Sequence, residues 1–222
     1  MLENIKAVIF DLDGSLADSM WVWTTIDMEY IKEYQLEVPP HFYTDMEGKS
    51  FTETAQYFLE TFPCLPLTLE ELKQDWVNRA YGKYTKEVKL KEGALEFLQM
   101  LKEKDIRTGI ATSNGRQLVE EFLRANHIDT FFDTVWTSCD VCIGKPAPDV
   151  YLKAAESLQT SPENCLVFED VPMGILAGKN AGMKVCAVED EFSKVQEKKK
   201  RELADYYIQN YNDIQNKTYE VL

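Results

Sequence analysis

The sequence lacks any uninterrupted apolar stretch of the about eighteen residues that a membrane-spanning helix requires. Positive charge is also in short supply, because 24 lysines and arginines stand against 38 aspartates and glutamates, for a net charge of −14. Such an excess repels nucleic-acid backbones and anionic membrane surfaces. We therefore expect neither a membrane nor a nucleic-acid polymer as a partner. The single basic run, KVQEKKKRE from Lys194, is predicted to be the solvated face of a helix.

The cysteines give no sign of a disulfide framework. Their number is odd, at five, and Cys165 and Cys186 lie in apolar, strand-like runs where a thiol packs as a small hydrophobe. The N-terminal stretch MLENIKAVIF lacks the basic start and the long apolar region of a secretory signal. We therefore expect a reduced, cytoplasmic setting. Cys139 and Cys142 have redox or metal spacing, but one pair alone does not make a zinc site, and a redox role is left open.

Short apolar runs alternate with helical patterns along most of the chain, and the hydrophobic content of 45% over 222 residues is enough for a real core. The predicted buried strands are KAVIF, RTGIAT, TVWTS, CLVFE and KVCAV, which begin at Lys6, Arg107, Thr134, Cys165 and Lys184. A run at Tyr206, YYIQN, is a candidate edge strand. The predicted helices between these strands cover residues 94–104, 117–125 and 149–158. This alternation predicts an α/β fold with a doubly wound parallel sheet.

The alternation stops after the first strand, where a long stretch contains helical patterns only. One helix is predicted to start near Met20, and FTETAQYFLETF makes another. Thr68 and Glu71 then form a capping-box pattern that opens a long helix. A purely helical block at this point predicts a separate cap over the sheet. The predicted division is a core of residues 1–16 and 89–222 and an inserted helical cap domain of residues 17–88.

Polar residues follow the predicted strands at the edge where open α/β sheets bind ligands. Asp11 and Asp13 end the first strand, and alternate residues of a strand point to the same side. Two charges about 6 Å apart repel by roughly 3 kcal/mol at an effective dielectric constant of about 20. The other strand ends contribute Thr112, Ser113, Asn114, Lys145, Glu169 and Asp170.

Four carboxylates at one edge cannot all ionise without a compensating cation. Their donors are all oxygens, and no histidine or cysteine accompanies them. This set of donors favours a hard cation, above all Mg²⁺.

With these motifs the chain resembles the haloacid-dehalogenase-like hydrolases, in the branch that holds phosphatases and β-phosphoglucomutases with a helical cap after the first strand. Four stretches carry the resemblance, in order and over essentially the whole chain: DLDGSLADS, IATSN, GKPAPDVY and FEDVPMGILAGKNAGM. The resemblance implies a Rossmann-like catalytic core and a Mg²⁺-dependent phosphomonoester hydrolase that works through an aspartyl-phosphate. The implied substrate is a small phosphorylated metabolite, either a sugar phosphate or a nucleoside monophosphate.

The resemblance also implies a role for each acid. Asp11 would be the nucleophile that attacks phosphorus. Asp13 would protonate the leaving alcohol and then activate water. Mg²⁺ would be bound by the Asp11 carboxylate, the Asp13 backbone carbonyl and Asp170, with Glu169 in or next to the coordination shell.

Further residues would bind the phosphoryl group and the rest of the substrate. The resemblance places Thr112 and nearby backbone amides on the phosphoryl oxygens, and Ser113 and Asn114 are further candidate substrate-binding residues. Lys145 would neutralise charge around the nucleophile and the phosphate. In the cap, Lys49 of the EGKS turn is a candidate substrate-binding residue.

Three positions depart from the family's pattern. Val171 stands where a serine or threonine often follows the ED pair. The mutases carry a cap histidine twelve residues beyond the nucleophile, where an ungapped count gives Trp23, and a phosphate-binding arginine where Phe51 stands. A sugar-phosphate mutase is therefore the weaker alternative.

An alternative from another class is a phospho-receiver signalling module, which also combines acids, a hydroxyl residue and a lysine on a doubly wound sheet. Receivers lack an inserted cap. They also stay phosphorylated, whereas a phosphatase releases phosphate repeatedly. The sequence specifies neither the substrate nor the oligomeric state.

Overall fold

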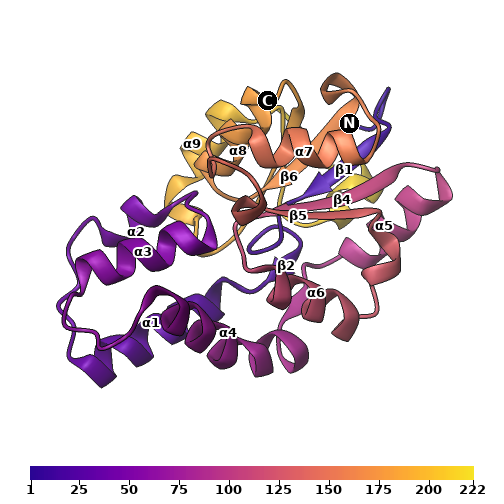
Figure 1. Ribbon diagram of the computed structural model, residues 1–222. Coiled ribbons are helices and arrows are strands. Elements are labelled where there is room, and N and C mark those ends of the chain that lie inside the picture. Colours follow the sequence, from indigo (N-terminus) through magenta and orange to yellow (C-terminus); the bar gives the residue numbers. More distant parts are fainter.

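The computed structural model describes residues 1–222 and contains a seven-stranded sheet with helices on both faces (Figure 1). The strand order is β5-β4-β1-β6-β7-β8-β9, and every neighbouring pair is parallel except β8 and β9. The strands are β1 (Ala7–Phe10), β4 (Arg107–Thr112), β5 (Thr134–Thr137), β6 (Cys165–Glu169), β7 (Lys184–Val188), β8 (Tyr206–Ile208) and β9 (Glu220–Val221). The predicted α/β fold with a doubly wound, mainly parallel sheet is confirmed.

The register of the central strands brings their carboxyl ends to one level. All four residues of β1 are apolar and buried, as expected of a strand covered on both faces. Phe10 at its end pairs with Ile110 of β4 and with Phe168 of β6. The residues that follow these three strands therefore emerge side by side at one edge.

Two hydrophobic clusters cover the two faces of the sheet. Because side chains alternate along a strand, Val8 and Phe10 belong to the larger cluster and Ala7 and Ile9 to the smaller one. Helices α5 and α6 pack into the larger cluster, and α7 and α8 into the smaller one. The helices outside the segment after β1 are α5 (Ala94–Glu103), α6 (Arg116–Ala125), α7 (Asp149–Ser157), α8 (Pro172–Asn180), α9 (Glu197–Leu203) and α10 (Asn212–Asn216). Short 3₁₀ turns occur at η1 (Asp129–Phe131), η2 (Ser138–Asp140), η3 (Pro162–Asn164) and η4 (Lys194–Gln196).

Residues 17–88, the helical segment, lie to one side of the sheet (Figure 1). The expected capping box is present, since Thr68 accepts from the backbone of Glu71 while the Glu71 side chain accepts from the backbone of Thr68. Helix α4 of this segment packs against α6. A two-stranded sheet of β2 (Ala17–Asp18) and β3 (Lys89–Leu90) joins the two ends of the segment. Its helices are α1 (Met20–Tyr34), α2 (Phe42–Met46), α3 (Phe51–Thr61) and α4 (Leu69–Lys86).

Two features of the C-terminal region differ from the prediction. Lys200 of the basic run is fully buried, and its ammonium group donates to the Val188 carbonyl at 3.1 Å and to Ser193 Oγ at 3.0 Å, which compensates for the loss of water. The strand at Tyr206 is not the edge of the sheet, since the chain returns and adds β9 beside it. All five cysteines are free thiols. None of the helices combines the length and the apolarity that crossing a membrane would require.

Candidate active site

One buried lysine binds two carboxylates at the carboxyl edge of the sheet. Lys145, from the loop between β5 and α7, places Nζ 2.6 Å from Asp11 Oδ1 and 2.6 Å from Glu169 Oε1. The Tyr151 hydroxyl also donates to Glu169 Oε1 at 2.6 Å. Asp11 and Lys145 are 6% exposed and Glu169 is fully buried. One ammonium cannot neutralise two buried carboxylates, so the group keeps a surplus negative charge.

A third acid stands beside this pair with one oxygen unused. Asp170 is buried, and its Oδ1 accepts a hydrogen bond from Ser15 Oγ at 3.1 Å. Its Oδ2 is buried and has no hydrogen-bond partner. Ligand atoms of Asp11, Glu169 and Asp170 all lie within 4.8 Å of one another. Such an arrangement calls for a cation.

Gly14 allows the acids to come this close. Its φ of +79° is a left-handed conformation that L side chains rarely adopt. A Cβ at this position would lie 2.3 Å from Asp170 Oδ2. The glycine of the DLDG stretch is thus required by both the turn and the neighbouring carboxylate.

Electrostatics show the same need for positive charge. Burial raises the pKa of Asp11 to about 8, although Lys145 lowers it. Burial, followed by the charges of Glu169 and Asp11, raises the pKa of Asp170 well above its ordinary value. Burial alone would lower the pKa of Lys145, but its two carboxylate partners outweigh that and raise it. The oxygen-only donor set and the unpaired Asp170 oxygen fit Mg²⁺.

The Asp13 carboxylate belongs to a different hydrogen-bond network. Strand β1 ends at Phe10, so Asp13 lies in the turn that follows it. Its Oδ1 accepts from Ser19 Oγ and from the hydroxyl of Tyr84 on α4. Its Oδ2 accepts from Asn114 Nδ2 at 2.8 Å, and the same amide donates to the Tyr84 hydroxyl at 3.0 Å. Burial raises the pKa of Asp13, and these hydrogen bonds oppose the rise.

Thr112 at the end of β4 and the two residues after it make different contacts. Thr112 Oγ1 accepts from the backbone N–H of Asn114 at 3.1 Å, which shapes the turn. The Ser113 hydroxyl lies 3.4 Å from Ser138 Oγ. The Asn114 side chain is fully engaged, because its amide holds Asp13 and its oxygen accepts from the backbone of Gly115 at 2.6 Å.

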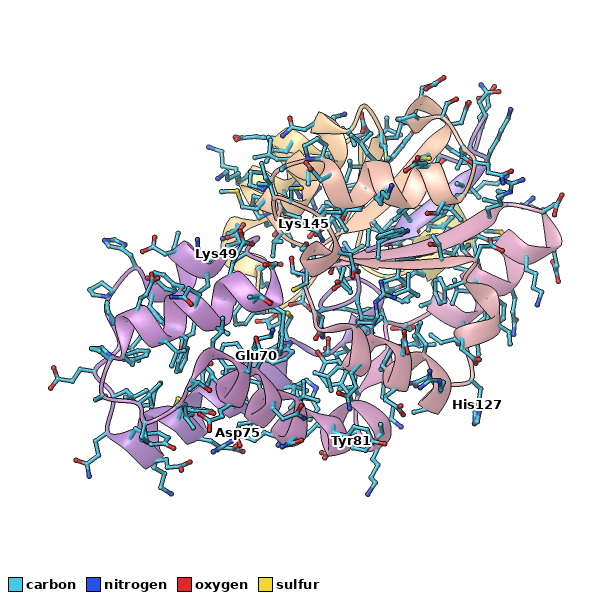
Figure 2. The ribbon with its side chains drawn as sticks, in the orientation of Figure 1. Lys49, Glu70, Asp75, Tyr81, His127 and Lys145 are labelled. Atoms are coloured by element: carbon cyan, nitrogen blue, oxygen red, sulfur yellow. The ribbon has the colours of Figure 1, made fainter.

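The helical segment reaches the acidic cluster through the turn before α3. Gly48 has a φ of +83°, and a Cβ there would lie 2.6 Å from the Lys145 carbonyl oxygen. Next to it, Glu47 accepts from the backbone of Met173 at 3.3 Å and from Gln196 Nε2 at 2.7 Å. Lys49 follows in the same turn, and Figure 2 shows it on the helical segment with Lys145 across from it on the loop after β5.

A cavity of about 560 Å³ lies between the strand ends and the helical segment. Every site residue predicted from the sequence lines it: Asp11, Asp13, Lys49, Thr112, Ser113, Asn114, Lys145, Glu169 and Asp170. The prediction from the sequence omitted Ser19, Tyr84 and Tyr151, which hold the predicted acids. Ser19 and Tyr151 are the last residues of the DLDGSLADS and GKPAPDVY stretches, so the motifs contained a signal for them, whereas Tyr84 lies in no motif and reaches Asp13 through the packing of α4.

Fold and site together define a doubly wound α/β protein with a buried acidic centre at the carboxyl ends of its strands. The chain matches the model of the haloacid dehalogenase-like hydrolase family over residues 8–188. It is 32% identical to the pyrophosphatase PpaX of Bacillus cereus (strain Q1) over 190 residues, which cover 83% of both chains. It is 29% identical to the phosphorylated carbohydrates phosphatase of Thermotoga maritima over 192 residues, 81% of this chain and 83% of that one.

Among solved structures, CbbY from Rhodobacter sphaeroides, in complex with phosphate, has the same fold. The TM-score is 0.82, with 23% identity over 95% of this chain and 96% of that one. The protein therefore belongs to the haloacid-dehalogenase-like hydrolase family, as the sequence motifs predicted.

Proposed function

We propose that the protein is a Mg²⁺-dependent phosphatase that releases phosphate from a small phosphorylated metabolite through an aspartyl-phosphate on Asp11. The single observation that carries this proposal is the buried Asp11–Lys145–Glu169 group beside Asp170, with its unpaired oxygen. Asp11 binds Lys145 through Oδ1, which leaves Oδ2 as the atom to attack phosphorus.

Charge around the phosphoryl group is handled by neighbouring residues. In this proposal the Lys145 ammonium neutralises part of the charge of nucleophile and phosphate, and the hydroxyls of Thr112 and Ser113 donate to phosphoryl oxygens. Mg²⁺ would be held by the carboxylates of Asp11 and Asp170 and the backbone carbonyl of Asp13, and it would supply further charge neutralisation. Glu169 already uses Oε1 for Lys145 and Oε2 for the backbone of Asp170. We therefore assign Glu169 to the orientation of Lys145, in a position beside the metal and not as a metal ligand.

Asp13 serves as the general acid and base in this proposal. It gives a proton to the oxygen of the leaving alcohol and later takes one from the water that hydrolyses the intermediate. A carboxyl whose pKa is raised by burial keeps its proton to a higher pH, which favours the first step. Tyr84, Ser19 and Asn114 position it for both.

We assign residues 17–88 to a cap over this centre and the rest of the chain to the catalytic core. The pairing of β2 with β3 at the two connections supports this division. The contacts of Glu47 and Gly48 with the core support a cap that lies over the centre. Lys49 in the same turn would contact the substrate. Three exposed free cysteines, among them Cys139 and Cys142, are in keeping with a reducing compartment such as the cytoplasm.

Phosphate release from a panel of phosphorylated metabolites tests the proposal. We expect many phosphates released per protein molecule from at least one small phosphomonoester. Stoichiometric phosphorylation without turnover would instead indicate a receiver. Net transfer of the phosphoryl group within a sugar would indicate a mutase, which the apolar Phe51 in the cavity wall disfavours.

Replacement of Tyr84 by phenylalanine is expected to lower kcat by about five- to tenfold, because the general acid loses one hydrogen bond while the ring stays in place. The loss should be larger for an alkyl phosphate than for p-nitrophenyl phosphate, whose leaving group needs little protonation. Tyr81→Phe is the matched control, since Tyr81 is an exposed tyrosine on the same helix (Figure 2). Equal losses on both substrates would remove Tyr84 from the positioning of Asp13.

A further inference from the structure

One carboxylate of the helical segment binds two separate elements of the rest of the chain. Glu47 directly follows α2, which lies close to α8 and α9 (Figure 1). Its Oε1 accepts from the backbone N–H of Met173, in the first turn of α8, at 3.3 Å. Its Oε2 accepts from Nε2 of Gln196, the last residue of η4, at 2.7 Å. A single side chain thus ties the end of α2 to both α8 and η4.

Helix α8 has no cap of its own at its N-terminus. Val171 is the N-cap residue, and its φ of −120° and ψ of 148° are the extended conformation typical of that position. Its side chain carries no oxygen, and Pro172 after it has no N–H to donate. The N–H of Met173 is therefore the first donor inside the helix, and Glu47 supplies the acceptor that Val171 lacks. A carboxylate also suits this end of a helix, where the dipole is positive.

The turn that follows Glu47 is in close contact with the loop that carries Lys145. A Cβ on Gly48 would lie 2.6 Å from the Lys145 carbonyl oxygen, and a Cβ on Gly144 would lie 3.1 Å from the Gly48 carbonyl oxygen. The two backbones therefore leave no room for a side chain between them. Lys49, the next residue, lines the cavity. The place of this turn thus determines where Lys49 lies relative to Lys145 (Figure 2).

We propose that Glu47 is a positioning residue, which caps α8 and binds Gln196 and thereby holds the turn of residues 47–49 beside Lys145. Lys49 then meets the part of the substrate that lies beyond the phosphoryl group. This inference rests on the proposed phosphatase function and adds a residue to it. Glu47 also lines the cavity. Both of its oxygens already accept from the protein, however, and its charge repels a phosphate, so the substrate contact is assigned to Lys49.

Kinetic constants of Glu47 variants test the inference. Glu47→Ala should raise KM about tenfold, the scale of hydrogen bonds to a charged group, for the ester of the metabolite panel that the parent hydrolyses fastest. The inhibition constant of inorganic phosphate, which occupies only the acidic centre, should stay within about twofold. Glu47→Gln keeps an acceptor oxygen and should raise KM less than Glu47→Ala. An unchanged KM, or equal rises in KM and in the phosphate constant, would overturn the inference.

A second substitution separates positioning from simple stabilisation of α8. Val171→Thr places a hydroxyl at the N-cap position with little change in side-chain shape. Added to Glu47→Ala, it should recover a melting temperature lowered by about 2–4 °C, the scale of one helix cap in a chain of this length. It should not recover KM, because the turn of residues 47–49 stays unattached. Recovery of KM together with the melting temperature would show that Glu47 acts only as a cap and would overturn the inference.

Hydrogen exchange of backbone amides measures the contact without any substrate. Amides of residues 46–53 should exchange at least about threefold faster in Glu47→Ala than in the parent, because the turn opens more often once it is released. Glu37→Ala is the matched control, since Glu37 is an exposed acid of the same helical segment. It should leave exchange and KM unchanged. Parent-like exchange in Glu47→Ala would overturn the inference.

The outcomes separate failure of this inference from failure of the proposed function. Absence of turnover on every ester by the parent protein would overturn the phosphatase function itself. Turnover by the parent, with the same KM in Glu47→Ala, would overturn only the role of Glu47.

Discussion

Replacing Asp11 with asparagine is expected to reduce turnover by at least about 10⁴-fold, the scale seen when the nucleophile of a covalent mechanism is removed. The amide keeps the size of the side chain, but it has no anionic oxygen to attack phosphorus. It also removes one of the two carboxylates bound to Lys145. Release of inorganic phosphate under saturating substrate is the measurement, with thermal melting to show that the variant is folded.

Asp18→Asn is the matched control for this prediction, because Asp18 is an exposed acid in the nearby strand β2. It should retain the parent rate within twofold. An Asp11→Asn variant that keeps a tenth or more of the parent rate would contradict the assignment of Asp11 as nucleophile.

Removal of divalent metal is expected to bring activity down to background. Lys145 binds only two of the three clustered acids, and the third, Asp170, keeps an unpaired oxygen, so the centre is electrostatically incomplete without a cation. After treatment with EDTA, Mg²⁺ should restore activity, whereas Ca²⁺ should restore it poorly because it prefers longer bonds and more ligands. Full activity after exhaustive chelation would contradict the proposed metal site.

A second readout of the metal does not depend on catalysis. A cation that binds only the folded protein raises its melting temperature in a concentration-dependent manner. We expect this rise for the parent protein and a much smaller one for Asp170→Asn. Equal rises for both would place the bound cation elsewhere.

The sequence was sufficient to predict the acidic centre because its residues follow buried strands. Parallel strands in register bring their carboxyl ends to one level, so motifs more than a hundred residues apart, such as those of Asp11 and Asp170, meet there. The same reasoning gave Thr112 and Lys145. No detailed knowledge of side-chain packing was needed for these four positions.

Contacts that depend on how a helix is rotated about its axis could not be predicted in this way. Tyr84 looks like any apolar-face residue of α4, and its hydroxyl reaches Asp13 only because α4 packs against α6. Lys200 stands in a run of basic residues typical of a solvated face. It is nevertheless fully buried, and its ammonium group binds the Val188 carbonyl at the end of β7 and the Ser193 hydroxyl in the following loop. Strands of two residues, such as β2 and β9, are too short to show any periodicity.

Detection of the phosphoenzyme tests the central claim, covalent catalysis by Asp11, most directly. Each variant is mixed with p-nitrophenyl phosphate, quenched rapidly in acid and weighed intact by mass spectrometry. Asp13→Asn keeps the nucleophile but loses the base for water, a role worth about 10²–10⁴-fold. It should therefore accumulate one added phosphoryl group, and Asp11→Asn should carry none at any pH. A phosphoryl group on Asp11→Asn, or parent turnover rates in both variants, would contradict the account.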